Sequence, residues 1–200
     1  MSDESVKKVL LMIADISGYT EFMVSTDLEI EHSQKIISQL ISTIIEQIDI
    51  PLEISKLEGD AVFIYSVKES EKHTWEHIRK VIGEKLILFF DVFRNKLSEI
   101  EQHHDCHCGA CANTDVLNLK IIVHSGEALF SYIKEFYELN GKDVILVHRL
   151  TKNSVEQDEY ILMTEPAYSD IEFPGQIEAQ EGFESYEHFG DIKTLVYYPQ

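Results

Sequence analysis

The chain has 200 residues, 44% hydrophobic and 26% charged, a balance typical of one globular domain with a sizeable core. Its formal net charge of −19 argues against binding to nucleic acid and to anionic membranes, because phosphate groups repel such a surface. No apolar run approaches the roughly 18 residues of a membrane helix, and no targeting segment is recognised. We therefore expect a single cytoplasmic domain over residues 1–200.

The first predicted element is a strand over Val6–Ile16, whose unbroken apolar run from Val9 to Ala14 indicates burial on both faces. Asp15 follows that run directly and precedes the turn residue Gly18. A carboxylate with apolar neighbours needs a cation or a shifted pKa. Asp15 is therefore interpreted either as a cap of the next helix or as a metal ligand at the strand end.

Helices and a hairpin are predicted for the next segment. A short helix comes first, and Thr26–Glu29 then has the form of a capping box that opens an amphipathic helix ending before Pro51. The runs Leu52–Leu57 and Ala61–Val67 are predicted to be strands of a hairpin that turns at Gly59.

The second half of the chain mixes helices with strands. A long helix over His73–Ile100 has apolar residues at steps of three and four. The later predictions are a Cys/His-rich insertion at 103–115, strands Leu117–Val123 and Glu127–Tyr132 turning at Ser125-Gly126, a helix Gly141–Leu150, a strand Tyr160–Met163, an acidic loop-rich segment at 165–185 and a strand Thr194–Tyr198. This order predicts an α+β fold with helices on one face of a mainly antiparallel sheet.

A second acid, Asp60, follows Gly59 in the predicted hairpin. In a βααββ arrangement the first strand can lie beside that hairpin, so Asp15 and Asp60 can converge at adjacent strand ends. Two such carboxylates can hold Mg²⁺ or Mn²⁺ against a triphosphate, where the metal neutralises charge and aligns an in-line displacement.

Four motifs resemble, in the same order, those of the class III nucleotidyl (adenylate and guanylate) cyclases. They are Asp15-Ile-Ser-Gly-Tyr-Thr20, Lys56-Leu-Glu-Gly-Asp60, Lys120-Ile-Ile-Val-His-Ser-Gly126 and Gly141-Lys-Asp-Val-Ile-Leu-Val-His-Arg149. Four motifs in order are far more specific than any one of them. With its cysteine-rich insertion, the chain is similar to a divergent bacterial branch of that superfamily. The resemblance implies a ferredoxin-like cyclase fold.

The resemblance also implies a metal half of the site. Asp15 and Asp60 would bind catalytic Mg²⁺ or Mn²⁺, with the carbonyl of Ile16 as a further ligand. In this family the site lies between two protomers, and the metal acids come from one of them. A homodimer with two equivalent sites is therefore expected.

The partner protomer would supply the nucleotide half of the site. Lys56 would contact the base of a nucleoside triphosphate, and Glu138 occupies the place where an Asp often reads adenine. Arg149 would stabilise the charge that develops on the phosphates, which suits a planar cation with several donors.

Two positions depart from the family pattern. Members usually carry Asn four residues before the Arg, and Ile145 at that position can neither orient a ribose nor donate to a phosphate. Phe189 stands nearest to the place of a Lys that clamps the triphosphate, where only Lys193 could substitute. Losing one such donor costs about 10²–10³ in rate. Two hypotheses follow: a cyclase that releases pyrophosphate, or a catalytically inactive cyclase-fold domain that senses a ligand or metal.

All three cysteines lie in a Cys-x-Cys-x-x-Cys spacing within the insertion, namely Cys106, Cys108 and Cys111. Three Cys with one His form an accepted tetrahedral zinc set, so a structural zinc site is expected, with His104 among the candidate fourth ligands. Other histidines nearby, or a residue of a partner chain, could serve instead. The alternative is an exposed loop with incidental thiols.

Overall fold

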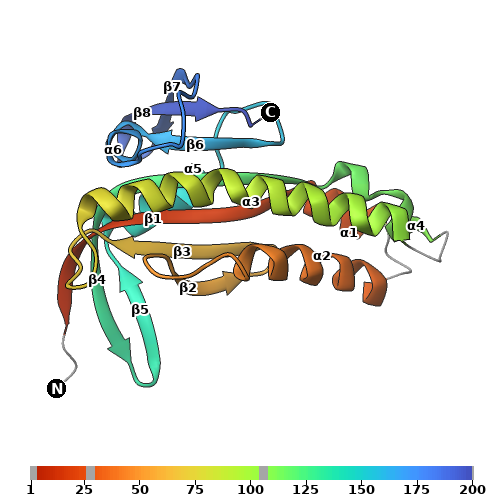
Figure 1. The fold of residues 1–200 in the computed structure, drawn as a ribbon, viewed down its shortest axis with the longest axis horizontal. Coiled ribbons are helices and arrows are strands. Elements are labelled where there is room, and N and C mark those ends of the chain that lie inside the picture. The colour runs from red at the N-terminus through yellow and green to blue at the C-terminus, as the bar shows by residue number, and fades with distance from the viewer. Residues whose placement is uncertain (1–3, 26–29, 104–107, 200) are drawn as a thin grey trace.

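The structure is a computed structural model, and it describes residues 4–25, 30–103 and 108–199. The elements run in the following order (Figure 1): β1 (Ser5–Ser17), α1 (Tyr19–Ser25), α2 (Ile30–Ile45), β2 (Glu53–Glu58), β3 (Ala61–Val67), α3 (Trp75–His103), α4 (Gly109–Ala112), η2 (Thr114–Val116), β4 (Asn118–Ile133), β5 (Phe136–Asn140), α5 (Lys142–Leu150), β6 (Tyr160–Thr164), α6 (Glu165–Asp170), β7 (Gln180–Tyr186) and β8 (Gly190–Tyr197).

Within the described residues, eight strands form one sheet in the order β2-β3-β1-β4-β6-β8-β7, and β5 pairs with β4 outside this path. Only β4 and β6 pair in parallel among these strands. The long strand β4 joins the parts of the sheet, because it pairs with β1, with β6 and, near its end, with β5. The predicted α+β class with a mainly antiparallel sheet is confirmed.

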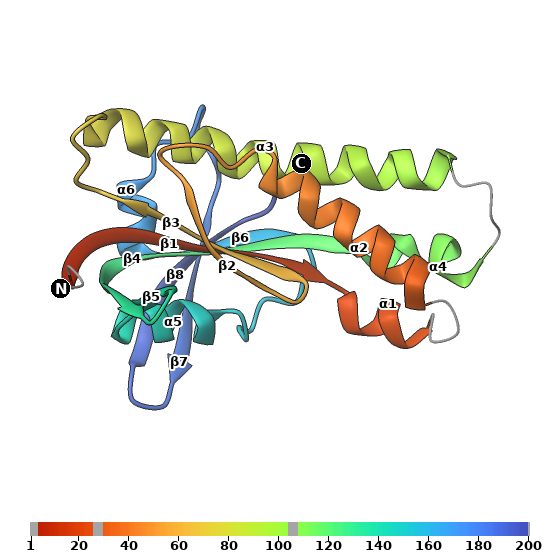
Figure 2. The same ribbon diagram turned by 90° about the horizontal axis from the view of Figure 1, so that it is seen from below.

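Helices cover both faces of this sheet, with α2 and α3 on one side and α5 on the other (Figure 2). Because side chains alternate along a strand, β1 contributes to both cores. Leu10, Met12, Ala14 and Ile16 pack on the side of α2 and α3, and Val9, Leu11 and Ile13 pack on the side of α5. The predicted burial of this strand on both faces is therefore confirmed. The helix α5 was also predicted, but it packs on the opposite face from α2 and α3 and not with them on one face.

Most predicted elements are present. The first strand, the two helices after it, the hairpin of β2 and β3, the long helix α3, α5, β6 and β8 all lie where the apolar patterns place them, with ends that differ by a few residues. The predicted capping box at 26–29 lies outside the described residues.

The predicted turn at Ser125-Gly126 is wrong. Residues 118–133 form one continuous strand, in which Ser125 and Gly126 pair with Leu10 and Val9 of β1. Gly126 instead allows the side chain of Asp143 to approach the strand closely, since a Cβ at this position would lie 2.3 Å from Oδ2 of Asp143. That carboxylate accepts a 2.7 Å hydrogen bond from the backbone N–H of Glu127.

The acidic segment 165–185 contains more regular structure than a loop. Pro166 lies in the first turn of α6, where its missing N–H costs no hydrogen bond. Gln180–Tyr186 forms β7 because it pairs with β8 across the hairpin, a contact that composition does not reveal. Residues 171–179 form neither helix nor strand.

Among the described residues, no helix combines the length and the apolar character that spanning a membrane requires.

Candidate functional site

The structure brings Asp15 and Asp60 together at the end of β1. Asp15 pairs with Ala61 across the β1–β3 ladder, and the backbone N–H of Ile16 donates to the carbonyl oxygen of Asp60 over 3.2 Å. Gly59 turns the chain there with a φ of +70°, a conformation that glycine adopts without strain. The two predicted acids therefore lie on adjacent strand ends.

The two carboxyl groups interact electrostatically. Burial, followed by the negative charge of Asp15, raises the pKa of Asp60 from 3.8 to about 6. Two acids that repel each other in this way have the charge and spacing that favour a bound cation. The residues present thus fit a divalent metal with oxygen ligands.

A cation of the chain itself already lies at this site. The ammonium of Lys120 is 3.1 Å from Oδ2 of Asp15, and its positive charge lowers the pKa of Asp60. Sequence analysis missed this role, although Lys120 belongs to one of the quoted motifs. The missing information was the register, which places Lys120 directly opposite Asp15 on the neighbouring strand.

The two predicted base-reading residues also meet. Lys56 of β2 lies 3.7 Å from Glu138 of β5 and 3.6 Å from Glu58. The structure therefore joins Lys56 and Glu138, which are far apart in sequence, in one exposed ion pair.

Asp15, Lys56 and Glu58 share the face of the sheet that α5 covers. Lys56 and Glu58 pair with Phe63 and Ala61, which pack on the α5 side, and side chains directly across a ladder point to the same face. Asp15 follows Val9, Leu11 and Ile13 in the same alternation.

Helix α5 brings one of its two basic side chains of the last turn, His148, to this face. His148 donates from Nδ1 to the carbonyl oxygen of Val144 over 2.7 Å, and its Nε2 lies 3.1 Å from Glu58. The His148 ring also packs edge-on against Phe63, which fixes the last turn of the helix. Arg149 follows in this last turn and is exposed.

Lys193 lies at the other end of the sheet from the acids. Its neighbour Thr194 pairs with Thr164, whereas Lys120, opposite Asp15, is level with Tyr160 at the start of β6. The ammonium of Lys193 forms ion pairs with Glu165 at 3.0 Å and with Glu181 at 3.3 Å. Within one protomer, the structure does not bring Lys193 to the acid pair.

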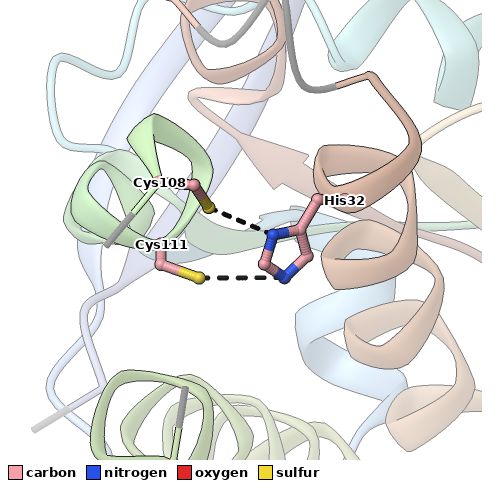
Figure 3. Close-up of side chains that lie close together, drawn as sticks. All are labelled: His32, Cys108 and Cys111. Carbon is pink, nitrogen blue, oxygen red and sulfur yellow. Dashed lines mark hydrogen bonds between the residues drawn. The ribbon is translucent and has the colours of Figure 1, made fainter. Parts of the chain in front are cut away.

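Two of the four predicted zinc ligands lie in the described residues. Cys108 and Cys111 meet His32 of α2, and the ligand atoms of the three residues all lie within 4.8 Å of one another (Figure 3). Cys106 and His104 lie outside the described residues. His32 was missed because it is 76 residues from Cys108 and belongs to no metal-binding spacing.

Comparison with solved structures defines the fold. The adenylyl cyclase CyaB of P. aeruginosa superposes with a TM-score of 0.72 at 14% identity, covering 99% of this chain and 97% of that chain. The guanylyl cyclase Cya2 superposes with a TM-score of 0.70 at 12% identity, covering 98% and 94%. This chain has the fold of the class III nucleotidyl cyclases.

Sequence comparison gives the family. The model of a family described as a protein of unknown function (DUF2652) matches residues 37–160, more than half of the chain, and the chain belongs to this family. The uncharacterized protein Rv2561/Rv2562 of Mycobacterium tuberculosis is 32% identical over 128 residues, which cover 64% of this chain and 57% of the relative. The match thus spans little more than half the length of that relative.

Proposed function

We propose that this chain is a cyclase-like subunit that binds Mg²⁺ or Mn²⁺ and a nucleoside triphosphate, and that it forms a cyclic nucleotide. The observation that carries this proposal is the pair Asp15 and Asp60 in a class III cyclase fold. Burial, followed by the negative charge of Asp15, raises the pKa of Asp60, and a divalent cation would relieve the repulsion between the two acids. The metal would supply charge neutralisation at the phosphates.

The nucleotide half rests on the cluster around Lys56. Lys56 and Glu138 together offer a donor and an acceptor, which is what recognition of the edge of a base requires. Arg149 is exposed in the last turn of α5 and would supply a permanent positive charge for phosphate oxygens. The ion pairs of Lys193 with Glu165 and Glu181 would have to open before its ammonium could reach a phosphate.

Exposed apolar side chains support assembly of a homodimer. Large apolar side chains are exposed on β2, on the paired ends of β4 and β5, and on α5, close to Lys56 and Glu138. They are Ile54, Leu57, Tyr132, Ile133, Phe136, Tyr137 and Ile145, whose exposed fractions range from 39% to 60%. Exposed apolar groups that gather in this way are typical of an interface. A second copy of the chain would complete each site, with acids from one protomer and Lys56, Glu138 and Arg149 from the other.

In the proposed reaction the ribose 3′-hydroxyl oxygen attacks the α-phosphorus. A bond between this oxygen and phosphorus forms as the bond to the β-phosphate oxygen breaks. Pyrophosphate leaves with the electron pair of that bond, and the hydroxyl proton passes to solvent. Positioning and charge stabilisation carry most of the catalysis in such a displacement.

The direct test incubates the purified protein with Mn²⁺ and, separately, with ATP, GTP, CTP and UTP, and measures cyclic products by mass spectrometry. We expect a product from at least one triphosphate that disappears in Asp60→Asn and persists in the control Asp191→Asn, which changes an exposed acid next to the β7–β8 turn. A folded dimer that yields no cyclic product from any triphosphate would contradict catalysis.

A second candidate function is binding without turnover, as in a ligand-sensing or metal-sensing domain. Ile145 favours it, because this side chain is 54% exposed on α5 and offers no hydrogen bond where class III cyclases usually carry Asn. Pyrophosphate release distinguishes the two functions. A sensor would bind Mn²⁺ and a triphosphate, as measured by calorimetry, but would release no pyrophosphate.

A further inference from the structure

Three side chains with metal-binding atoms meet between α2 and α4, away from the acid pair. Nδ1 of His32 lies 3.1 Å from Sγ of Cys108, and Nε2 of the same ring lies 3.7 Å from Sγ of Cys111. Figure 3 shows the imidazole facing both sulfur atoms, which come from one turn of the chain around α4. The three ligand atoms lie within 4.8 Å of one another.

These separations are close to those of one tetrahedral ion. With Zn–S of about 2.3 Å and Zn–N of about 2.0 Å, a nitrogen and a sulfur on the same zinc are about 3.5 Å apart. The observed 3.1 and 3.7 Å lie on either side of that value, the first from Nδ1 and the second from Nε2 of His32. One imidazole gives one nitrogen to an ion, so the ring has to turn until a single nitrogen faces both sulfur atoms.

We propose that His32, Cys108 and Cys111 bind a thiophilic divalent metal ion, with zinc as the expected occupant. Two thiolates and an imidazole form a donor set that selects zinc over Mg²⁺ or Ca²⁺, which prefer oxygen. This site is chemically distinct from the carboxylate pair of Asp15 and Asp60, so its existence does not depend on the proposed cyclase activity.

The surroundings combine burial with access. Cys111 is only 4% exposed, which shields the metal–thiolate bonds from water, whereas His32 and Cys108 are partly exposed. A cavity of about 210 Å³ borders the cluster and is lined by His32, Lys35, Gln39, Lys96, Glu99 and Cys111. An ion and a water ligand can therefore reach the site through this cavity.

A bound ion would fasten α2 to α4 across 76 residues of chain. This link would also connect to the segment that carries Asp15. The short helix η2 follows α4, and Val116, the last residue of η2, packs on Gly18. A Cβ at Gly18 would lie 2.0 Å from the carbonyl oxygen of Val116, so no side chain fits between them. Gly18 lies three residues after Asp15, so a bound metal would help to hold the end of β1 in place.

The test measures metal in protein purified under reducing conditions without a polyhistidine tag. We expect about one equivalent of zinc by elemental analysis, and a cobalt-substituted protein with the visible and near-ultraviolet bands of thiolate coordination. Cys108→Ser and His32→Gln should each lose most of the metal, whereas His188→Asn, which changes an exposed histidine, should retain it. Circular dichroism checks that the variants fold.

Two results would overturn the proposal. One is folded wild-type protein that holds less than about a tenth of an equivalent of zinc and shows no thiolate–cobalt bands. This result counts against the proposal even if the metal is absent because Cys108 and Cys111 form a disulfide. The other is zinc retention by His32→Gln equal to that of the wild type. If the variants fail to fold, two measurements on the wild type test the proposal. Thiolate bands in the cobalt spectrum, and a thermal stability that falls on chelation and returns with zinc, would support it; the absence of both would contradict it.

Discussion

The ammonium of Lys120 lies 3.1 Å from Oδ2 of Asp15, directly across the β1–β4 ladder. Both side chains are largely shielded from water, with exposures of 21% and 16%. This ion pair occupies part of the coordination capacity of Asp15 and lowers the repulsion between the two acids. A metal ion bound by Asp15 would have to compete with Lys120, a role of this lysine that no motif indicates.

Removal of this competing charge should strengthen metal binding. We expect Lys120→Met to lower the Kd for Mn²⁺ by about tenfold, equivalent to about 1.4 kcal/mol. Isothermal titration calorimetry measures this, with Lys80→Met, a substitution on the exposed surface of α3, as the matched control. Unchanged or weaker binding of Mn²⁺ by Lys120→Met would show that the ammonium does not compete with the metal.

Metal binding should depend on pH through Asp60. Because its pKa is raised to about 6, Asp60 is protonated in more acidic solution and must release its proton to bind a cation. The affinity for Mn²⁺ should therefore rise as the pH increases through about 6 and level off above it. Calorimetry across this range tests the expectation, and an affinity that is flat between pH 5 and pH 7 would contradict it.

The stability of the metal-free protein should show the opposite trend. The folded state holds the Asp60 proton more tightly than the unfolded chain, whose pKa is near 3.8. This contribution to stability is complete below 3.8 and is lost as the pH rises through about 6. We expect Asp60→Asn to remove this loss, so that its melting temperature exceeds that of the wild type at pH 7 but not at pH 4. Differential scanning calorimetry with chelator present makes the comparison.

If the protein is a cyclase, Arg149 should affect turnover more than binding. A cation that acts on charge developing at the phosphates contributes mainly in the transition state, so Arg149→Ala should lower kcat by about 10²–10³ with little change in KM. Arg149→Lys should recover only part of this loss, because lysine lacks the planar fork of donors. A raised KM with an unchanged kcat in both variants would instead assign Arg149 to binding of the substrate in the ground state.

The exposed end of the β4–β5 pair should control assembly. Phe136, which is 60% exposed, pairs with Ile133, which is also 60% exposed, where the two strands project from the body of the sheet (Figure 1). A charge buried in an interface is costly, so Phe136→Asp should convert a dimer into a monomer. Light scattering after size-exclusion chromatography measures the mass, and Phe183→Asp, an exposed position on β7, is the control. A Phe136→Asp protein that remains dimeric would place the interface elsewhere.

Local patterns predicted the elements more reliably than their partners. The apolar run before Asp15, the spacing in α3 and the Gly59 turn each depend on contacts within a few residues, and the structure confirms them. Gly126 led to a wrong turn because glycine marks both turns and close approaches, and only the position of Asp143 separates the two. The strand β7 was missed because its pairing partner lies elsewhere in the chain.

For the candidate site, the sequence by itself determined which chemical groups are available: the acids Asp15 and Asp60, the lysine and acid Lys56 and Glu138, and the clustered cysteines. Only the tertiary structure decided what each group meets. Lys120 reaches Asp15 through strand register, and His32 reaches Cys108 through the packing of α2 near α4. The physical reason is that charge and coordination act over a few ångströms, and folding sets such distances between residues that are remote in the chain.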